Sequence, residues 1–288
     1  MANQSILIAQ RTPPRRVTAA KYLSLLLLIV LLVVVLFPLA VITLNSFKTE
    51  DEYFRHGPLS LPQRISLDNV RAVWDRLDYT VKLKNSFIIS MATALAGVGL
   101  SLFNAFALGI GKIRGRAFFL MFFVMAITLP HEVLAYPLYY MFKEVGLYDS
   151  RWAVVIIFAV LHSAFGTYLL ASVFNVFPEE LLDAAVIDGC NKLQLLFRIV
   201  VPINWPSLSV LFVFFFIWTW NEFFLPLIFL VSNANQTVPL AVAMFQGQRG
   251  AAATFQSTAS LLGVLPCIVF FIIFQRTLSK GIVAGSIK

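Results

Sequence analysis

Charged residues are scarce in this sequence, and their scarcity constrains the class of protein it encodes. Asp, Glu, Lys and Arg make up 12% of the 288 residues, whereas about one quarter of a soluble domain is charged. Hydrophobic residues make up 59% and form long runs that do not alternate with polar residues. Only helices or closed barrels satisfy the backbone in lipid. The composition therefore excludes an ordinary soluble domain and predicts an all-α, polytopic membrane protein.

Cysteine is also rare, and the sequence lacks the motifs of a catalytic site. Cys190 lies in a polar loop and Cys267 in the last apolar run, so we expect neither a disulfide nor a metal site. The phosphate-binding pattern G-x-x-x-x-G-K-[ST] is absent, because Gly109, Gly111 and Lys112 have neither its spacing nor its hydroxyl. No nucleophile–base pair is recognisable. We predict that this chain is not an enzyme and has no cofactor or metal of its own.

The net charge of +8 does not indicate a nucleic-acid-binding protein. The basic residues flank the apolar runs rather than forming a patch interleaved with aromatic residues. Nucleic acid is therefore excluded as a partner.

Six apolar runs are long enough to cross a bilayer, which takes about 20 residues per helix. A removable signal peptide is not expected at the first run, because it is longer than such peptides require and no small-residue cleavage site follows. The six runs define a transmembrane domain at 22–278, between tails at 1–21 and 279–288. The predicted spans are 22–44, 86–110, 117–141, 152–174, 208–232 and 258–278.

The basic residues between spans predict the orientation of the chain. Lys112, Arg114 and Arg116 follow the second span without any acid, which is typical of a short cytoplasmic loop. Both tails are then cytoplasmic. The predicted outer loops are 45–84, 143–151 and 233–256. Within the first of them, a short helix at the membrane surface is expected at 66–74.

The most informative stretch is the polar loop 178–206, PEELLDAAVIDGCNKLQLLFRIVVPINWP. Pro178 suits the first position of a helix, and the acids after it suit the positive end of the helix dipole. Gly189 suits a helix stop in the left-handed conformation. A second amphipathic helix is expected from Lys192 to about Val200, where Pro202 prevents smooth continuation. The stretch predicts two short helices joined by a glycine, with Ala184 and Ala185 allowing a partner to approach closely.

This loop resembles the cytoplasmic loop of the membrane subunits of bacterial ABC importers. The family pattern is Glu-Ala-Ala, three residues, Gly, nine residues, Ile, any residue and Leu-Pro. Here the same spacing carries Asp183-Ala184-Ala185, Gly189, Ile199 and Val201-Pro202, in which Asp replaces Glu and Val replaces Leu. The resemblance implies a cytoplasmic coupling helix that docks on an ATP-hydrolysing subunit. The implied coupling residues are Glu180, Asp183, Ala184, Ala185, Gly189, Ile199 and Pro202.

The resemblance also implies partners and a location. An ABC ATPase dimer binds the ATP and Mg²⁺ that this chain does not, and a second, related permease completes a heterodimer. An extracytoplasmic solute-binding protein docks around 45–84 and 233–256. Lipid surrounds the spans, and the location is the bacterial inner membrane with both termini cytoplasmic.

Three phrases resemble the carbohydrate branch of these importers, and so imply an oligosaccharide as cargo. They are GLYDSRWAVVI at 146–156, WNEFFLPLIF at 220–229 and the KGIVAGSIK tail at 280–288. One alternative is a non-sugar cargo such as glycerol-3-phosphate or a peptide. Another is an ion-coupled secondary transporter, which would show an inverted internal repeat; no clear repeat is present.

Polar residues at membrane depth are functional candidates by default. Asn221 and Glu222 either line the substrate path or cap broken helices near Pro226. His131 and Glu132, which follow Pro130, either belong to the path or satisfy polar groups at a kink. Asn104 and His162 are more simply explained by hydrogen bonds between helices.

Overall fold

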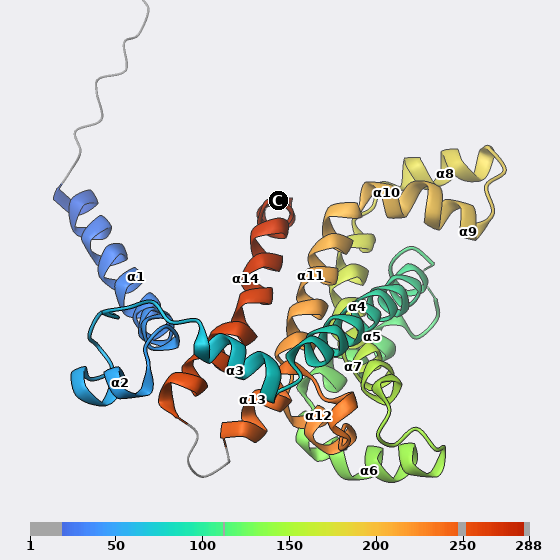
Figure 1. The fold of residues 1–288 in the computed structure, drawn as a ribbon. Helices are drawn as coiled ribbons and strands as arrows, with labels where there is room; N and C mark the ends of the chain where they lie inside the picture. The colour runs from blue at the N-terminus through green and yellow to red at the C-terminus, as the bar shows by residue number, and fades with distance from the viewer. Residues whose placement is uncertain (1–18, 112, 247–251, 285–288) are drawn as a thin grey trace, which may run out of the picture.

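The structure, a computed structural model, describes residues 19–111, 113–246 and 252–284, and in these ranges every regular element is a helix (Figure 1). Four helices are long and apolar enough to cross a membrane. They confirm the first, second, fourth and sixth predicted runs as helices, although each of the four begins before the predicted residue. These helices are α1 (Ala19–Ser46), α4 (Tyr79–Gly109), α7 (Arg151–Asn175) and α14 (Ala253–Ala284).

The predicted span at 117–141 is interrupted at Pro130, where a kink was expected. α5 (Arg116–Thr128) and α6 (His131–Glu144) meet at 97°. Leu129 is extended at the break, as the residue before a proline tends to be. Pro130 therefore ends the helix and redirects the chain.

The predicted span at 208–232 is also interrupted. α11 (Trp205–Asn221) ends before Glu222, whose backbone is extended, and a short α12 (Phe224–Phe229) follows. A second bent pair precedes it, since Lys192–Ile203 meets α11 at 81°. The described residues thus hold up to six candidate spans if each bent pair is one span.

Short helices occupy the predicted outer loops. α3 (Asp68–Arg76) confirms a short helix near the expected position 66–74. In contrast, α2 (Glu50–His56), the turn η2 (Asn233–Asn235) and α13 (Val238–Gln246) were not expected. The sequence of α2 nevertheless favours a helix: Thr49 caps its first turn, three acids follow, and two basic residues end it, as the helix dipole favours.

The expected tails meet the described residues only at their inner ends. Most of the tail at 1–21 lies outside the described residues. α14 continues to Ala284, so the helix does not end at 278, and the last residues of the KGIVAGSIK tail again lie outside the described part.

The core of the fold lies where α4 packs along α7 and α11, whereas α1 packs mainly on α14 (Figure 1). A Cβ added at Gly166 of α7 would lie 2.8 Å from Cβ of Ser101 on α4 and 2.9 Å from Cζ of Phe215 on α11. Ala94 and Ala105 of α4 are fully buried. Small residues therefore set how closely the helices approach, as expected of helices in lipid.

Polar side chains hold the segment after α12 against the starts of α4 and α7. Lys82 donates to Asn233, and Asn85 donates to the carbonyl of Ala234 at 2.7 Å.

Asp149 accepts from Ser232 and from Asn235. Burial alone raises the pKa of Asp149, but these hydrogen bonds outweigh it and hold the pKa below the ordinary value of 3.8. The carboxylate therefore remains charged and keeps this segment in place.

Lys48 is buried completely just after α1. Its ammonium donates to Oδ1 of Asn45 at 3.0 Å and to the carbonyls of Gly57 at 3.0 Å and Pro58 at 3.2 Å. Burial lowers the pKa of Lys48, and the nearby Glu52 carboxylate opposes the shift. These bonds satisfy all three donors of the ammonium and fasten the loop after α1 to the end of that helix.

Candidate functional site

The loop predicted to couple forms a two-helix knob, defined here as Glu179–Ile203, which projects from one end of the bundle (Figure 1). α8 (Glu179–Ile187) begins with Glu179 and Glu180 in its first turn. Pro178 is the N-cap rather than the first helical residue. The helix therefore begins one residue later than predicted. The two acids thus lie where the helix dipole favours negative charge.

Gly189 ends α8 as predicted, with a left-handed φ of +76°. The N–H of Gly189 donates to the carbonyl of Val186 at 3.0 Å, and the N–H of Cys190 donates to that of Ala185 at 3.0 Å. These two bonds are those of a Schellman motif, which a glycine permits without strain. The turn therefore fixes the angle between the two helices of the knob.

The second helix of the knob begins with a capping box between Asn191 and Gln194. It comprises α9 (Lys192–Leu195), the π-helical turn η1 (Leu196–Val200) and α10 (Val201–Ile203). It therefore continues past the predicted end at Val200. The wider turn of η1 shifts the hydrogen-bond pattern just before Pro202, so the missing N–H of the proline does not stop the helix there.

Burial divides the predicted coupling residues into two groups. Ala185 is buried against the core of its own chain, which corrects the expectation that it faces a partner, and Ile199 is half-buried. Ala185 is small because α8 packs closely on the bundle. The others remain exposed: Glu180, Asp183, Ala184, Gly189 and Pro202.

The exposed side of the knob also carries apolar residues. Ile187 is 85% exposed and Val186 64% exposed at the end of α8. On the second helix, Leu193 is exposed, whereas Leu196 and Val200 are buried. An apolar surface edged by acids at the end of a membrane bundle can bind a protein partner.

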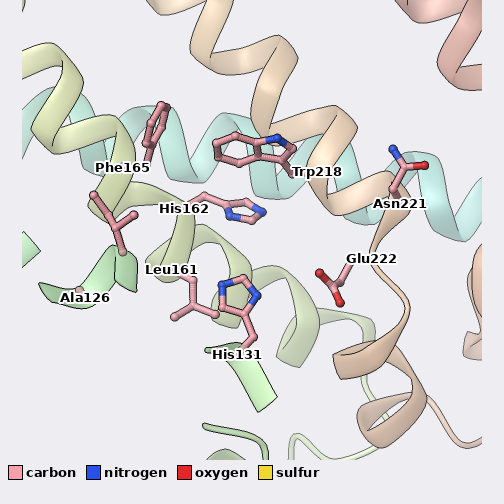
Figure 2. Close-up of a pocket in the computed structure, with 9 residues that line it drawn as sticks. Ala126, His131, Leu161, His162, Phe165, Trp218, Asn221 and Glu222 are labelled. Carbon is pink, nitrogen blue, oxygen red and sulfur yellow. The ribbon is translucent and has the colours of Figure 1, made fainter. Parts of the chain in front are cut away.

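A cavity of about 380 Å³ lies beside the two helix breaks. It is lined by α5, His131 at the start of α6, α7, and the end of α11 with Glu222. Figure 2 shows His131, His162, Trp218 and Glu222 around the same space. Three of the four predicted path residues thus come together, whereas Glu132 is exposed and does not line the cavity.

Glu222 and Asn221 have structural roles as well as a place at the cavity. Oε1 of Glu222 accepts the N–H of Phe224 at 3.1 Å and so caps α12. The amide of Asn221 donates to the carbonyl of Ile217 at 2.8 Å and approaches Sγ of Cys267 at 3.7 Å. The capping alternative therefore holds at Glu222, and the second oxygen of its carboxylate is left to accept at the cavity.

The position of His162 differs most from the interpretation based on the sequence. As expected, it bonds between helices, with Nε2 3.2 Å from Oγ1 of Thr219 on α11. However, it also lines the cavity together with Phe165 and Trp218. Helical spacing in the sequence could have placed these residues at the cavity, since residues three or four apart share a face. Trp218 precedes Asn221 by three residues, and His162 precedes Phe165 by three.

The lining of the cavity is that of a binding pocket. In the described part of the chain, no group of three or more His, Cys, Asp or Glu could hold a metal ion. The cavity combines aromatic faces with a few polar groups, which is the usual composition of a ligand pocket.

Comparison with known proteins decides the family. Residues 97–283 match the family described as binding-protein-dependent transport system inner membrane component, and this range is more than half of the chain. The chain belongs to this family. It is therefore a permease subunit of a binding-protein-dependent ABC importer, a multi-pass inner-membrane transport component and not a catalytic enzyme.

Two relatives align with the permease over most of its length. It is 30% identical over 259 residues to the arabinooligosaccharides transport system permease protein AraQ of Halalkalibacterium halodurans, covering 88% of this chain and 91% of the relative. It is 29% identical over 276 residues to the probable starch degradation products transport system permease protein AmyC of Thermoanaerobacterium thermosulfurigenes, covering 95% and 99%.

A solved structure supports the fold of the permease. The crystal structure of a bacterial ABC transporter involved in the import of the acidic polysaccharide alginate contains a chain that matches with a TM-score of 0.79 at 18% identity, covering 92% of this chain and 98% of that chain. The similarity confirms the predicted fold family.

Proposed function

We propose that this permease forms half of the path of an importer for an oligosaccharide and is driven by ATPase subunits that dock on its knob. The cargo proposal is supported by relatives whose names specify arabinooligosaccharides and starch degradation products. The three sugar-branch phrases of the sequence agree with it.

The observation that carries the coupling proposal is the knob itself. Its spacing matches the importer loop, and it projects as two short helices fixed by a Schellman turn. Its exposed apolar residues and acids form a surface for the ATPase. In this mechanism, ATP binding closes the ATPase dimer, and the knob moves with it as a lever that turns the spans outward. Hydrolysis then restores the inward-facing state.

The orientation that we propose has six spans and both termini in the cytoplasm. The start of α1, the end of α14 and the knob lie toward one side of the bundle in Figure 1, whereas α2, α6, α12 and α13 lie toward the other. This arrangement supports a cytoplasmic knob and an outer face around 45–84 and 233–256, where a solute-binding protein docks. A second, related permease would complete the path.

The alternative cargoes considered above have less support. Glycerol-3-phosphate carries negative charge, and the cavity presents a Glu222 carboxylate rather than a Lys or Arg among its lining residues. A peptide remains chemically compatible with the cavity, but neither of the relatives described above is named for peptide transport.

Purification of the tagged permease from its native membrane in mild detergent tests the assembly. We expect mass spectrometry to identify an ABC ATPase and a second permease in amounts comparable to the tagged chain. Recovery of the chain alone, or only with copies of itself, would contradict the proposed heterodimeric importer.

A further inference from the structure

The cavity at the two helix breaks differs from an ordinary packing gap in its lining. Its volume of about 380 Å³ lies at the lower end of the roughly 300–1,000 Å³ typical of ligand pockets. The volume fits a short saccharide unit rather than a whole oligosaccharide.

One wall of the cavity is aromatic. Trp218 is 41% exposed, and Phe214 stacks against it with ring centroids 5.8 Å apart and an interplanar angle of 6°. Phe165 meets the ring of Trp218 edge-on at 5.2 Å. The indole is thus held in one orientation by its neighbours while much of it remains accessible. A rigid aromatic ring of this kind offers an apolar surface to the C–H face of a sugar ring.

The side of the cavity that contains His162 is also held in place by its neighbours. Its ring stacks between Phe158 and Phe215, with ring centroids 5.4 Å apart on both sides. Its Nε2 bond to Thr219 orients the ring. The cavity wall therefore keeps its shape without a bound molecule, which reduces the entropy lost on binding.

The polar wall combines one carboxylate, that of Glu222, with the imidazoles of His131 and His162. Glu222 faces the cavity opposite His131 (Figure 2), and its carboxylate retains acceptor capacity beyond the bond to Phe224. Among the described residues that line the cavity, none is Lys or Arg. A carboxylate with no fixed cation beside it accepts hydroxyl donors and repels anions.

We infer that this cavity is a subsite of the translocation path that binds one neutral sugar unit, with Trp218 as the stacking surface and Glu222 as both hydrogen-bond acceptor and filter against anionic sugars. The inference rests on the proposed carbohydrate cargo and names its charge class. It also distinguishes this chain from an importer of an acidic polysaccharide, despite the similar fold.

The test uses the whole complex, with its ATPase, second permease and binding protein, in proteoliposomes. Uptake is measured for maltotriose and arabinotriose as neutral probes and for trimannuronate as an anionic probe. Wild type is expected to take up a neutral trisaccharide and to exclude trimannuronate.

Two variants and a control separate the roles of the cavity residues. Trp218→Leu keeps apolar volume but loses the ring face, and is expected to raise KM for the neutral sugar roughly three- to tenfold. Glu222→Gln keeps an oxygen that can cap α12 but loses the charge; it is expected to raise this KM about tenfold and to reduce the discrimination against trimannuronate. Trp152→Leu, at an exposed tryptophan that does not line the cavity, should behave like wild type.

Several results would overturn the inference. Wild-type kinetics in both cavity variants would show that the cavity does not contact the sugar. A lower maximal rate with unchanged KM would assign both residues a structural role only. Preferential uptake of trimannuronate by wild type would refute the filter. If wild type takes up none of the three sugars while the binding protein still stimulates ATP hydrolysis, the proposed cargo fails and the inference fails with it.

Discussion

Replacing Gly189 by Asp is expected to uncouple ATP hydrolysis from transport while the permease still inserts in the membrane. Gly189 has a φ of +76°, where a residue with a side chain costs about 1–2 kcal/mol. A difference of that size changes an equilibrium by roughly 5- to 30-fold. Asp also adds a negative charge next to Asp188 at the end of α8. The altered turn would change the angle between the helices and weaken docking. The measurement is the number of sugar molecules imported per ATP hydrolysed in proteoliposomes.

Gly146 provides a matched control for this substitution. It has a φ of +71°, and, as at Gly189, a Cβ added there would meet no atom within 4 Å. It lies in the turn between α6 and α7, away from the knob. Gly146→Asp therefore introduces the same residue and a similar strain, and should leave the coupling ratio unchanged. Normal coupling in Gly189→Asp would count against the docking role of the knob.

Replacing Gly166 by Ala is expected to destabilise the bundle. The new methyl would lie 2.8 Å from Cβ of Ser101 and 2.9 Å from Cζ of Phe215, so α7 would have to move away from α4 and α11 together. Overpacking of this kind typically costs about 1–3 kcal/mol. We expect a lower midpoint of thermal unfolding in detergent, followed by the loss of monodisperse protein on a sizing column.

Gly99→Ala is the control for this second substitution. Gly99 lies in the middle of α4, and a Cβ there meets no atom within 4 Å. Because Ala favours a helix over Gly by about 1 kcal/mol, this variant should be as stable as wild type or slightly more stable. Equal destabilisation by the two substitutions would show that close packing at Gly166 does not limit stability.

The sequence predicted those features that depend on local spacing. The apolar runs predicted the helices, because a span needs only length and hydrophobicity. In the knob, Gly189 and the acids at the start of α8 acted through neighbouring residues, so their effects were predictable from the order of the chain.

Features that depend on contacts between distant residues were not predictable. Ala185 matched a family pattern, but only the packing of α8 on the bundle shows that it faces inward. Lys48 resembles any charged loop residue in sequence, yet its partners are carbonyls of a loop that folds back on it. Pro130 indicated a possible break in the third run, but the bend of 97° depends on where α6 packs.

The cavity was predicted in part. Asn221, Glu222 and His131 were found because polar residues are rare in apolar helices. Trp218 and Phe165 were missed because the sequence contains 28 phenylalanines and 5 tryptophans, and composition alone does not distinguish those at a helix break.

Site-specific photo-crosslinking at the knob would show whether an ATPase docks there. A photoreactive phenylalanine derivative would replace Ile187, which is 85% exposed at the end of α8, and in a control Val145, which is 63% exposed after α6. In native membranes, we expect a crosslink from position 187 to an ABC ATPase and none from position 145. No ATPase adduct at 187, or an equally strong one at 145, would contradict the proposal that this knob couples the permease to ATP hydrolysis.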